Sequence, residues 1–216
     1  HILQICDSLF PVGAFTLSNG LETYVQRDII TSPKGLEEYL HSYISVLPYN
    51  ELGAAAAAYN ADEKELCRLD EIYSAMKTPF EIRSGSEKVT RRFFKICNNG
   101  RESFTGLYKS LTEQGKCKGH QCIAYGLYMR DNGIELSEGL AVYGYSICST
   151  IVTNCVKLVP LSQLAGQKIL GESFELISSA SEKALFTDIN DIGISGAGFD
   201  LRAMQHELLY SRQYMS

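Results

Sequence analysis

Apolar side chains recur along most of this chain at alternating spacings of three and four residues. In the segment 35–47 the apolar positions are Leu36, Tyr39, Leu40, Tyr43, Ile44 and Leu47. This spacing places one apolar stripe along an α-helix. Pro33 stands where a helix needs no amide donor, and Pro48 ends the pattern. The segment is therefore predicted to be an amphipathic helix.

Similar patterns predict further helices along the chain. They cover the segments 63–76, 80–97, 120–130, 136–159 and 161–186, with a break at Pro160 between the last two. The alanine run at 54–58 consists of strong helix formers whose small side chains let a neighbouring helix come close. Residues 98–119, with a turn signal at 98–100, form a less regular stretch. No segment shows the alternation that is typical of a β-strand.

These elements predict an all-α fold without an internal repeat or a long linker. We expect a single-domain helical bundle of roughly eight to ten helices over residues 1–188, followed by a flexible C-terminal tail over 189–216. The tail begins with a loop rich in Gly, Asn and Asp at 189–198, after which Asp200 can cap a short helix. One side of that helix carries Leu201, Met204, Leu208 and Leu209. The helix either becomes ordered on binding a partner or folds back on the chain's own core.

The segment 139–156 carries no charged side chain and approaches the length of a membrane-spanning helix. Its hydroxyl, phenol and amide groups are costly to place in lipid, so we interpret it as a central helix packed on all sides by other helices. The seven cysteines do not have the spacing of a small secreted disulfide framework, and Cys148 and Cys155 stand within this apolar run. These features predict a protein of the reducing cytoplasm that does not bind a membrane.

A basic face marks the helix predicted at 80–97. One stripe of this helix carries Lys88, Arg91, Arg92 and Lys95. Such a face is either a solvated helix surface or a docking surface for an acidic partner. Nucleic acid is disfavoured as a partner, because the chain has a net charge of −5 and no aromatic platform interleaves with these few cations.

The sequence lacks the common motifs of enzymes. It contains no Gly-x-x-x-x-Gly-Lys-Ser/Thr phosphate loop and no Gly-x-Ser-x-Gly nucleophile elbow. The pair Gly196 and Gly198 lacks the third glycine and the preceding strand of a dinucleotide fingerprint. His206 is followed by Glu207 but has no second histidine four positions later. The chain is therefore predicted not to be an enzyme.

Metal binding is the chemical alternative that the sequence offers. Cys117, His120 and Cys122 stand close together in the chain, and thiolate and imidazole ligands suit Ni²⁺ or Zn²⁺. However, no fourth ligand is evident, and the three side chains converge poorly if residues 120 and 122 begin a helix. The other interpretation is a loop cysteine, a histidine at a helix start and a buried cysteine, so no metal site is assigned.

The segment 6–22 combines fixed turns at Pro11, Gly13 and Gly20 with small and capping side chains, which suits a protein partner better than a substrate. Together with two later segments, it resembles the UreF family of urease accessory proteins. The matching segments are DSLFPVGAFTLSNGLETY at 7–24, YGYS at 143–146 with VKLVPLSQLAGQ at 156–167, and DLRAMQHELLYSRQYMS at 200–216. A weaker match is RSGS at 83–86 with the arginines at 91 and 92. These segments span nearly the whole chain in the order expected for the family.

The resemblance implies an all-α, usually dimeric, cytoplasmic protein without catalytic activity of its own. Members of the family bind the accessory protein UreD, called UreH in some organisms, and this pair recruits the GTPase UreG so that Ni²⁺ reaches apo-urease. No cofactor is implied to be bound permanently, and nickel and GTP are implied to be handled by the wider complex. The alternatives are a regulator of the partner GTPase's hydrolysis, with Arg212 supplying positive charge to phosphates, and a metal-binding helical protein.

The resemblance also implies which residues face partners. Phe15 and Arg212 match positions of the UreG-recruiting surface, and the segment 201–216 matches the tail that becomes ordered against UreD. The implied partner-binding residues are Phe15, Leu201, Arg202, Met204, His206, Tyr210, Arg212 and Ser216. The chain departs from the family pattern at Leu17, where many members have His, and at Thr90, where Gly is common.

Overall fold

Helices make up all the regular secondary structure of the residues that the computed structural model describes, which are 1–97, 100, 102–194 and 196–215. In chain order the elements are α1 (Ile2–Ile5), η1 (Ala14–Thr16), α2 (Leu21–Gln26), α3 (Pro33–Val46), η2 (Leu47–Tyr49), α4 (Glu51–Asn60), α5 (Glu63–Met76), α6 (Phe80–Ile96), α7 (Phe104–Glu113), α8 (Gln121–Asp131), α9 (Leu136–Leu158), α10 (Gln163–Glu172), α11 (Phe174–Ala184), η3 (Ile189–Asp191) and α12 (Ala197–His206). The all-α prediction is confirmed. The segment predicted as one helix at 161–186 divides at Ser173 into α10 and α11. The turn predicted at 98–100 lies largely outside the described residues.

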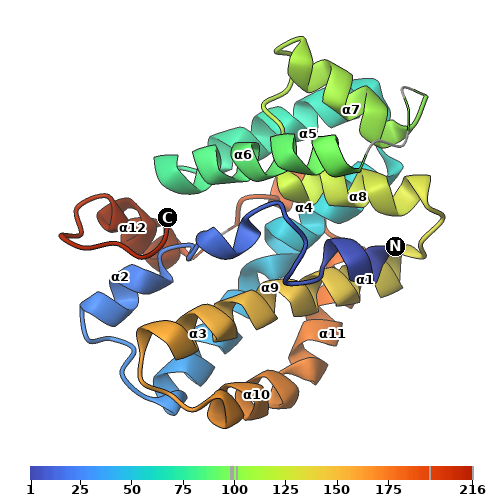
Figure 1. Ribbon diagram of the computed structural model, residues 1–216. Coiled ribbons are helices and arrows are strands. Elements are labelled where there is room, and N and C mark those ends of the chain that lie inside the picture. The colour runs from blue at the N-terminus through green and yellow to red at the C-terminus, as the bar shows by residue number, and fades with distance from the viewer. Residues whose placement is uncertain (98–99, 101, 195, 216) are drawn as a thin grey trace.

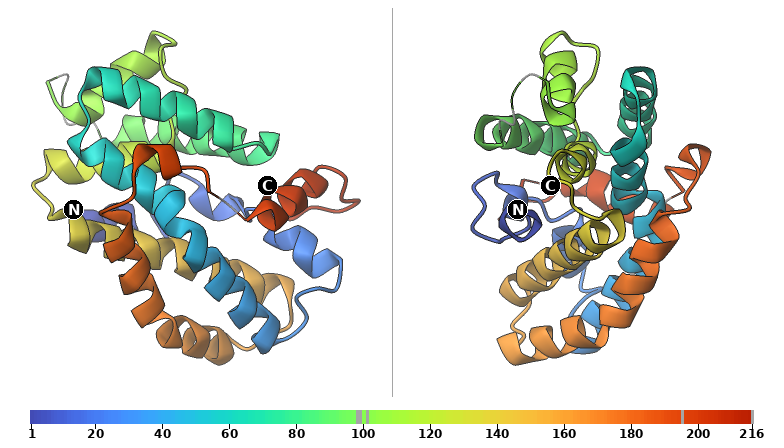
Figure 2. Two further views of the ribbon diagram at one scale, coloured as in Figure 1. Left: turned by 180° about the vertical axis from the view of Figure 1, so that it is seen from behind. Right: turned by 90° about the vertical axis from the view of Figure 1, so that its right-hand side faces the viewer.

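The helices form layers on both sides of a central pair, α4 and α8 (Figure 1). On one side lie α5, α6 and α7, and on the other side lie α3, α9, α10 and α11, as both views of Figure 2 also show. The N-terminal α1 packs on α9, whereas α12 packs on α2 and α6. The two ends of the chain therefore lie at opposite edges of the molecule, with the C-terminal segment beside α2 (Figure 1).

Small side chains let the central helices α4 and α8 approach each other closely. Gly126 of α8 lies against the backbone of α4, so that a Cβ atom at this position would be 2.1 Å from the carbonyl oxygen of Ala55. Ala54, Ala55 and Ala58 of α4 are fully buried. The prediction that the alanine run at 54–58 admits a close neighbouring helix is therefore confirmed.

The uncharged segment 139–156 lies within α9, a helix long and apolar enough to cross a membrane. Half of its most apolar window is buried inside the protein. The helices α3, α10 and α11 pack on it, and the Asn154 amide donates to the carbonyl oxygen of Leu17 at 3.3 Å. The segment therefore belongs to the core along one side, whereas the expectation that other helices cover it on all sides is wrong, since Tyr145 is 41% exposed.

The stretch at 98–119, predicted to be less regular, contains the helix α7. The Ser103 hydroxyl oxygen accepts a backbone N–H of the first turn at 2.9 Å. Asp131, at the end of α8, accepts the backbone N–H groups of Phe104 and Thr105 at 2.8 and 2.9 Å. These two caps stabilise a short helix whose glycine and threonines have low helix propensity. The second cap comes from a distant part of the chain, so the local pattern does not reveal it.

A buried carboxylate joins α5 to α7 and to the loop before α8. Asp70, which is 2% exposed, accepts the Tyr108 hydroxyl at 2.6 Å. It also accepts the backbone N–H groups of Lys118 and Gly119 at 2.7 and 3.0 Å. Hydrogen bonds of this kind stabilise a buried carboxylate. They fix the backbone that leads into His120 and α8.

Candidate functional site

The C-terminal segment lies across α2 and the start of α6, beside the N-terminal motif (Figure 1). Ala203 of α12 packs on Gly20, where a Cβ atom would be 2.9 Å from the Ala203 backbone nitrogen. Beyond α12, the Met215 N–H donates to the carbonyl oxygen of Thr16 at 2.8 Å. Of the two arrangements considered for the tail, the structure therefore has the helix folded back on the chain's own core.

A buried cluster of charged side chains holds the tail against the rest of the protein. His206, at the end of α12, is fully buried between Glu22 of α2 and Glu81 of α6. Its Nε2 lies 3.0 Å from Oε2 of Glu22, and its Nδ1 lies 2.6 Å from Oε2 of Glu81. The Arg212 Nη1 donates to the other Glu81 oxygen at 2.7 Å. We call Glu22, Glu81, His206 and Arg212 the tail clamp.

The tail clamp sets two carboxylates against two cations. Both ring nitrogens of His206 face carboxylate oxygens, and ionised carboxylates only accept hydrogen bonds, so the doubly protonated imidazole is the form that satisfies both contacts. Glu22, 1% exposed, also accepts the backbone N–H groups of Gln213 and Tyr214 at 2.8 and 3.1 Å. Removing one member leaves a buried charge without its partner, which is strongly unfavourable. The position of the tail therefore depends on the whole cluster.

The predicted partner-binding set contains His206 and Arg212 but neither Glu22 nor Glu81. In the structure His206 is fully buried, so it holds the tail in place and is turned away from the surface. Glu22 stands between Leu21 and Thr23, which are both fully buried. A carboxylate between two buried residues would have indicated a structural role for Glu22. The sequence alone does not show that Leu21 and Thr23 are buried, so this signal could not be used.

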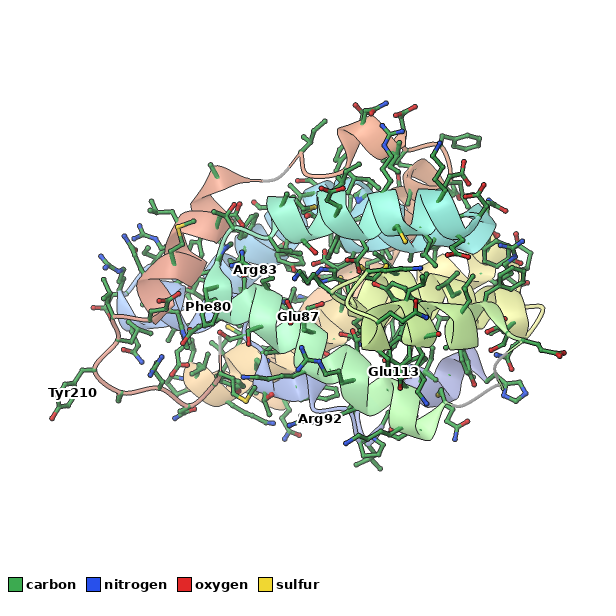
Figure 3. The ribbon with its side chains drawn as sticks, turned by 90° about the horizontal axis from the view of Figure 1, so that it is seen from above. Phe80, Arg83, Glu87, Arg92, Glu113 and Tyr210 are labelled. Carbon is green, nitrogen blue, oxygen red and sulfur yellow. The ribbon has the colours of Figure 1, made fainter. Side chains whose placement is uncertain are left out.

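Three other predicted partner-binding residues are exposed on the tail. Leu201 is 52% exposed and Met204 is 38% exposed. Tyr210 is fully exposed and projects into solvent at the edge of the molecule (Figure 3). Ser216 lies outside the described residues. The tail thus presents apolar side chains to solvent while its polar groups bind the body of the protein.

The remaining two predicted residues lie at the borders of this region. Phe15 is half-buried in η1, next to Thr16, which accepts the hydrogen bond from the tail. Arg202 is half-buried, and its guanidinium lies 5.8 Å from the centre of the Tyr24 ring. The structure therefore gathers the N-terminal and C-terminal motifs, far apart in sequence, into one region.

A groove of about 420 Å³ runs between the tail and α6, and we call it the tail groove. It is lined by Phe80, Glu81, Ser84, Gly85, Lys88, Arg212, Tyr214 and Met215. Phe80 is 62% exposed and lies at the same end of the molecule as Tyr210 (Figure 3). The groove therefore combines exposed apolar surface with the cations Lys88 and Arg212, a combination suited to a protein partner.

The candidate metal ligands Cys117, His120 and Cys122 do not converge. The Cys117 sulfur lies 3.7 Å from the sulfur of Cys67, whereas the His120 ring lies between two serine hydroxyls at 2.7 and 3.3 Å. Burial raises the pKa of the Cys122 thiol to about 12. Within the described part of the chain, no three His, Cys, Asp or Glu side chains are arranged to hold a metal ion. The structure agrees with the other interpretation, a histidine at a helix start and a buried cysteine.

Because His120 is buried, we expect the free energy of unfolding to decrease when the pH is lowered. Burial, reinforced by Lys77 and Arg83 and opposed by Asp70, lowers the pKa of His120 from 6.5 to about 4. Between these two pH values the folded protein binds fewer protons than the unfolded chain, so the free energy of unfolding falls as the pH falls. A change from pH 7 to pH 5 is expected to lower it by about 2 kcal/mol through this group. Urea unfolding should show a weaker pH dependence in His120→Gln, and equal dependence in both proteins would contradict this assignment.

A small cavity of about 90 Å³, lined by both apolar and polar side chains, lies beneath the N-terminal motif. Its lining includes Ser18, Asn19, Tyr43, Gln121, Tyr143 and Thr150. Glu51 and Lys77, both largely buried, form an ion pair of 2.7 Å at its wall. The Oδ1 of Asn154 is buried there and has no hydrogen-bond partner within the described residues. These groups make the cavity suitable for a polar occupant.

Comparison of the sequence with known proteins identifies its relatives. Residues 30–173 match the family model described as UreF. The chain is 31% identical to the urease accessory protein UreF of Streptococcus salivarius (strain 57.I), over 100% of this chain and 94% of that protein. It is 34% identical to UreF of Actinobacillus pleuropneumoniae serotype 5b (strain L20), over 100% and 97%, and to UreF of Haemophilus influenzae (strain Rd), over 100% and 94%. The tail clamp lies partly outside residues 30–173 but within these full-length alignments.

Proposed function

The chain belongs to the UreF family of urease accessory proteins, and on this basis we propose that it is a non-catalytic scaffold in urease maturation. In this role it joins UreD, or UreH in some organisms, and recruits the GTPase UreG for the insertion of nickel into apo-urease. Nickel is the cargo of the assembly, and GTP is bound by the partner. No cofactor is assigned to the chain itself.

The observation that carries this proposal is the surface formed by the tail. Leu201, Leu208 and Tyr210 of the tail are more than half exposed, and the exposed Phe80 of α6 lines the tail groove together with Tyr214 and Met215. Exposed apolar side chains gathered on one region are typical of a protein-binding surface. The titratable groups beneath it, Glu22 and His206, are almost completely buried and engaged with each other. Their burial and mutual contact support a structural role for the tail clamp. The exposed apolar side chains above it are then the part of the tail that is suited to docking.

The environment of Arg212 favours docking over the regulation of GTP hydrolysis. An arginine that acts on a partner's phosphates has to place its charge in the partner's active site. Here the Arg212 guanidinium is bonded to Glu81 at 2.7 Å, and its side chain is 43% exposed. The carboxylate already balances its charge. The ion pair fits a residue that shapes the recruiting surface for UreG.

A homodimer is the second part of the proposal. Apolar side chains are exposed on α9, α10, α11 and the following turn, namely Tyr145, Leu164, Phe174, Leu176 and Phe186. Tyr145 and Phe174 contact each other edge to face at 5.8 Å. This surface lies away from α12 (Figure 1), so a second copy can cover it while the tail remains available to UreD. The seven cysteines are free, which fits a cytoplasmic protein.

Removal of the tail tests the proposal. A chain truncated before Asp200 is expected to lose binding to UreD almost completely, because the apolar tail surface is missing, while its helical content changes little. Size-exclusion chromatography with light scattering, on the chain mixed with UreD and UreG from the same source, measures the complex. Far-UV circular dichroism and the mass of the truncated chain alone provide the control for folding and for the dimer. Unaltered assembly with UreD by a folded truncated chain would contradict the assignment of the tail.

A further inference from the structure

A second groove, of about 380 Å³, lies between α6 and α7. Its lining residues are Arg91, Phe94, Lys95, Lys109, Thr112 and Glu113. None of them lines the tail groove. Figure 3 looks down on this side of the molecule, where Glu87 and Arg92 of α6 and Glu113 of α7 are labelled. We call it the α6–α7 groove.

Positive charge dominates the rim of the α6–α7 groove. Three of its lining residues are cations, Arg91, Lys95 and Lys109, and one is an anion, Glu113. Arg91 pairs with Glu87 at 3.0 Å within α6, and Lys109 pairs with Glu113 at 4.0 Å within α7; in each pair one side chain is at least 60% exposed to solvent. Exposed pairs of this kind are weak and exchange readily with other partners. Lys95 forms no ion pair in the part of the chain that the structure describes.

The rest of the basic face of α6 has other contacts. The Arg92 Nη1 donates to the carbonyl oxygen of Val12 at 3.2 Å and ties α6 to the N-terminal motif. Lys88 lines the tail groove. Of the four basic residues of this face, Arg91 and Lys95 therefore belong to the α6–α7 groove, and Lys109 of α7 joins them. The sequence pattern of α6 alone does not indicate Lys109.

The floor of the α6–α7 groove is apolar. Phe94 packs edge to face on the buried Tyr108, at 5.8 Å between ring centres. The Thr112 hydroxyl donates to the Tyr108 carbonyl oxygen at 2.9 Å, so its single donor hydrogen is already used within α7. The aliphatic stems of lysine and arginine side chains add apolar surface at the rim. A ligand in this groove would therefore contact positively charged groups at the rim and apolar side-chain atoms at the floor.

We propose that the α6–α7 groove binds an acidic protein segment that also carries an apolar side chain. The chain as a whole has a net charge of −5 and repels acidic partners, so a groove with three cations is a local exception that directs such a segment to one place. An apolar side chain of the segment would cover the floor while its carboxylates pair with the rim. Glu113 interrupts the cations and no exposed ring lines the groove, which disfavours a nucleic-acid strand. The inference uses no residue of the tail and goes beyond the proposed function.

A synthetic peptide with a fluorescein label, Glu-Leu-Glu-Glu-Leu-Leu-Glu-Glu, is the probe for this groove. Fluorescence anisotropy is expected to show binding that weakens about tenfold or more in Lys95→Glu/Lys109→Glu, because two attractive pairs become repulsive. The matched control is Lys34→Glu/Lys168→Glu, which changes the net charge equally at two exposed lysines; these pair with Glu38 and Glu172 at i,i+4 spacing, as Lys109 does with Glu113. This control is expected to bind the peptide almost as the unaltered chain does.

The possible outcomes distinguish peptide binding in this groove from binding through the net charge of the protein. They also distinguish an acidic peptide from a nucleic acid as the ligand. Zero-length carbodiimide coupling is expected to join the peptide to Lys95 or Lys109, and coupling mainly to other lysines would overturn the proposal. Equal weakening in both double variants would do the same, and so would absence of peptide binding. Tighter binding of single-stranded oligothymidylate, lost in the groove variant, would assign the groove to nucleic acid instead. Assembly of both variants with UreD and UreG is measured in parallel, so that a failure of the groove is distinguished from a failure of the scaffold role.

Discussion

Replacement of His206 by leucine is expected to detach residues 197–215 from α2 and α6 while the rest of the helical fold persists. The imidazole is the contact between Glu22 and Glu81, which belong to different helices. Without it, two carboxylates remain at a largely buried site with Arg212 as their one clamp cation. Removing one partner of a buried ion pair costs about 3–5 kcal/mol, so the docked position of the tail becomes unfavourable.

Hydrogen exchange measures this release directly. Amides of 197–215 are expected to lose about hundredfold or more of their protection in His206→Leu, whereas those of α4 and α8 keep theirs. Glu207→Leu is the matched control, because it makes the same kind of change at the next position, which is exposed. Native-like protection of α12 in His206→Leu would show that the clamp does not hold the tail.

A second set of variants separates charge from shape. In a chain that already carries Glu22→Gln and Glu81→Gln, the histidine has no carboxylate to neutralise. The further change His206→Leu is then expected to have a much smaller effect on exchange in α12 than it has in the unaltered chain, since neutral amides at these positions leave no buried charge. Equal effects in both backgrounds would mean that the size of the imidazole, and not its charge, fixes the tail.

Gly126→Ala is expected to destabilise the whole fold although alanine is the better helix former. The added methyl group would lie 2.1 Å from the carbonyl oxygen of Ala55 and 2.9 Å from its carbonyl carbon, and both atoms belong to the backbone of α4. One helix therefore has to move away from the other, which loosens the packing at the centre of the molecule. Overpacking of this kind costs about 1–3 kcal/mol, occasionally more, and we expect a value at the upper end.

Thermal unfolding of two glycine variants tests this packing. For a chain of this length, about 3 kcal/mol corresponds to a fall in Tm of roughly 6–12 °C. Gly171→Ala in α10 is the control, because a Cβ atom there meets nothing within 4 Å. It is expected to raise Tm slightly through helix propensity, by about 1 kcal/mol or less. If both variants changed Tm in the same direction, close packing of α4 on α8 would not be the cause.

The sequence predicts the helices well where one face of each is apolar. The pattern at 35–47 corresponds to α3, and the one at 63–76 corresponds to α5, whose N-terminus is capped by Asp62. The missed helix α7 shows the limit of this approach, because Asp131, one of its two caps, is supplied by the end of α8. Helix periodicity is a local property, and it is visible without knowledge of the fold.

For the candidate site, too, some features can be predicted from the sequence and others only from the tertiary structure. The motifs at 7–24 and 200–216 mark the region and resemble those of the family, and the lack of common enzyme motifs predicts that the chain is not an enzyme. The sequence by itself therefore determines most of the helices, their apolar faces and the terminal segments that form the candidate site. Only the tertiary structure decides that Glu22, Glu81 and His206 meet, and that Cys117, His120 and Cys122 face different neighbours. The physical reason is that burial and charge pairing arise between helices, so the distance between two residues along the chain does not determine whether their side chains meet.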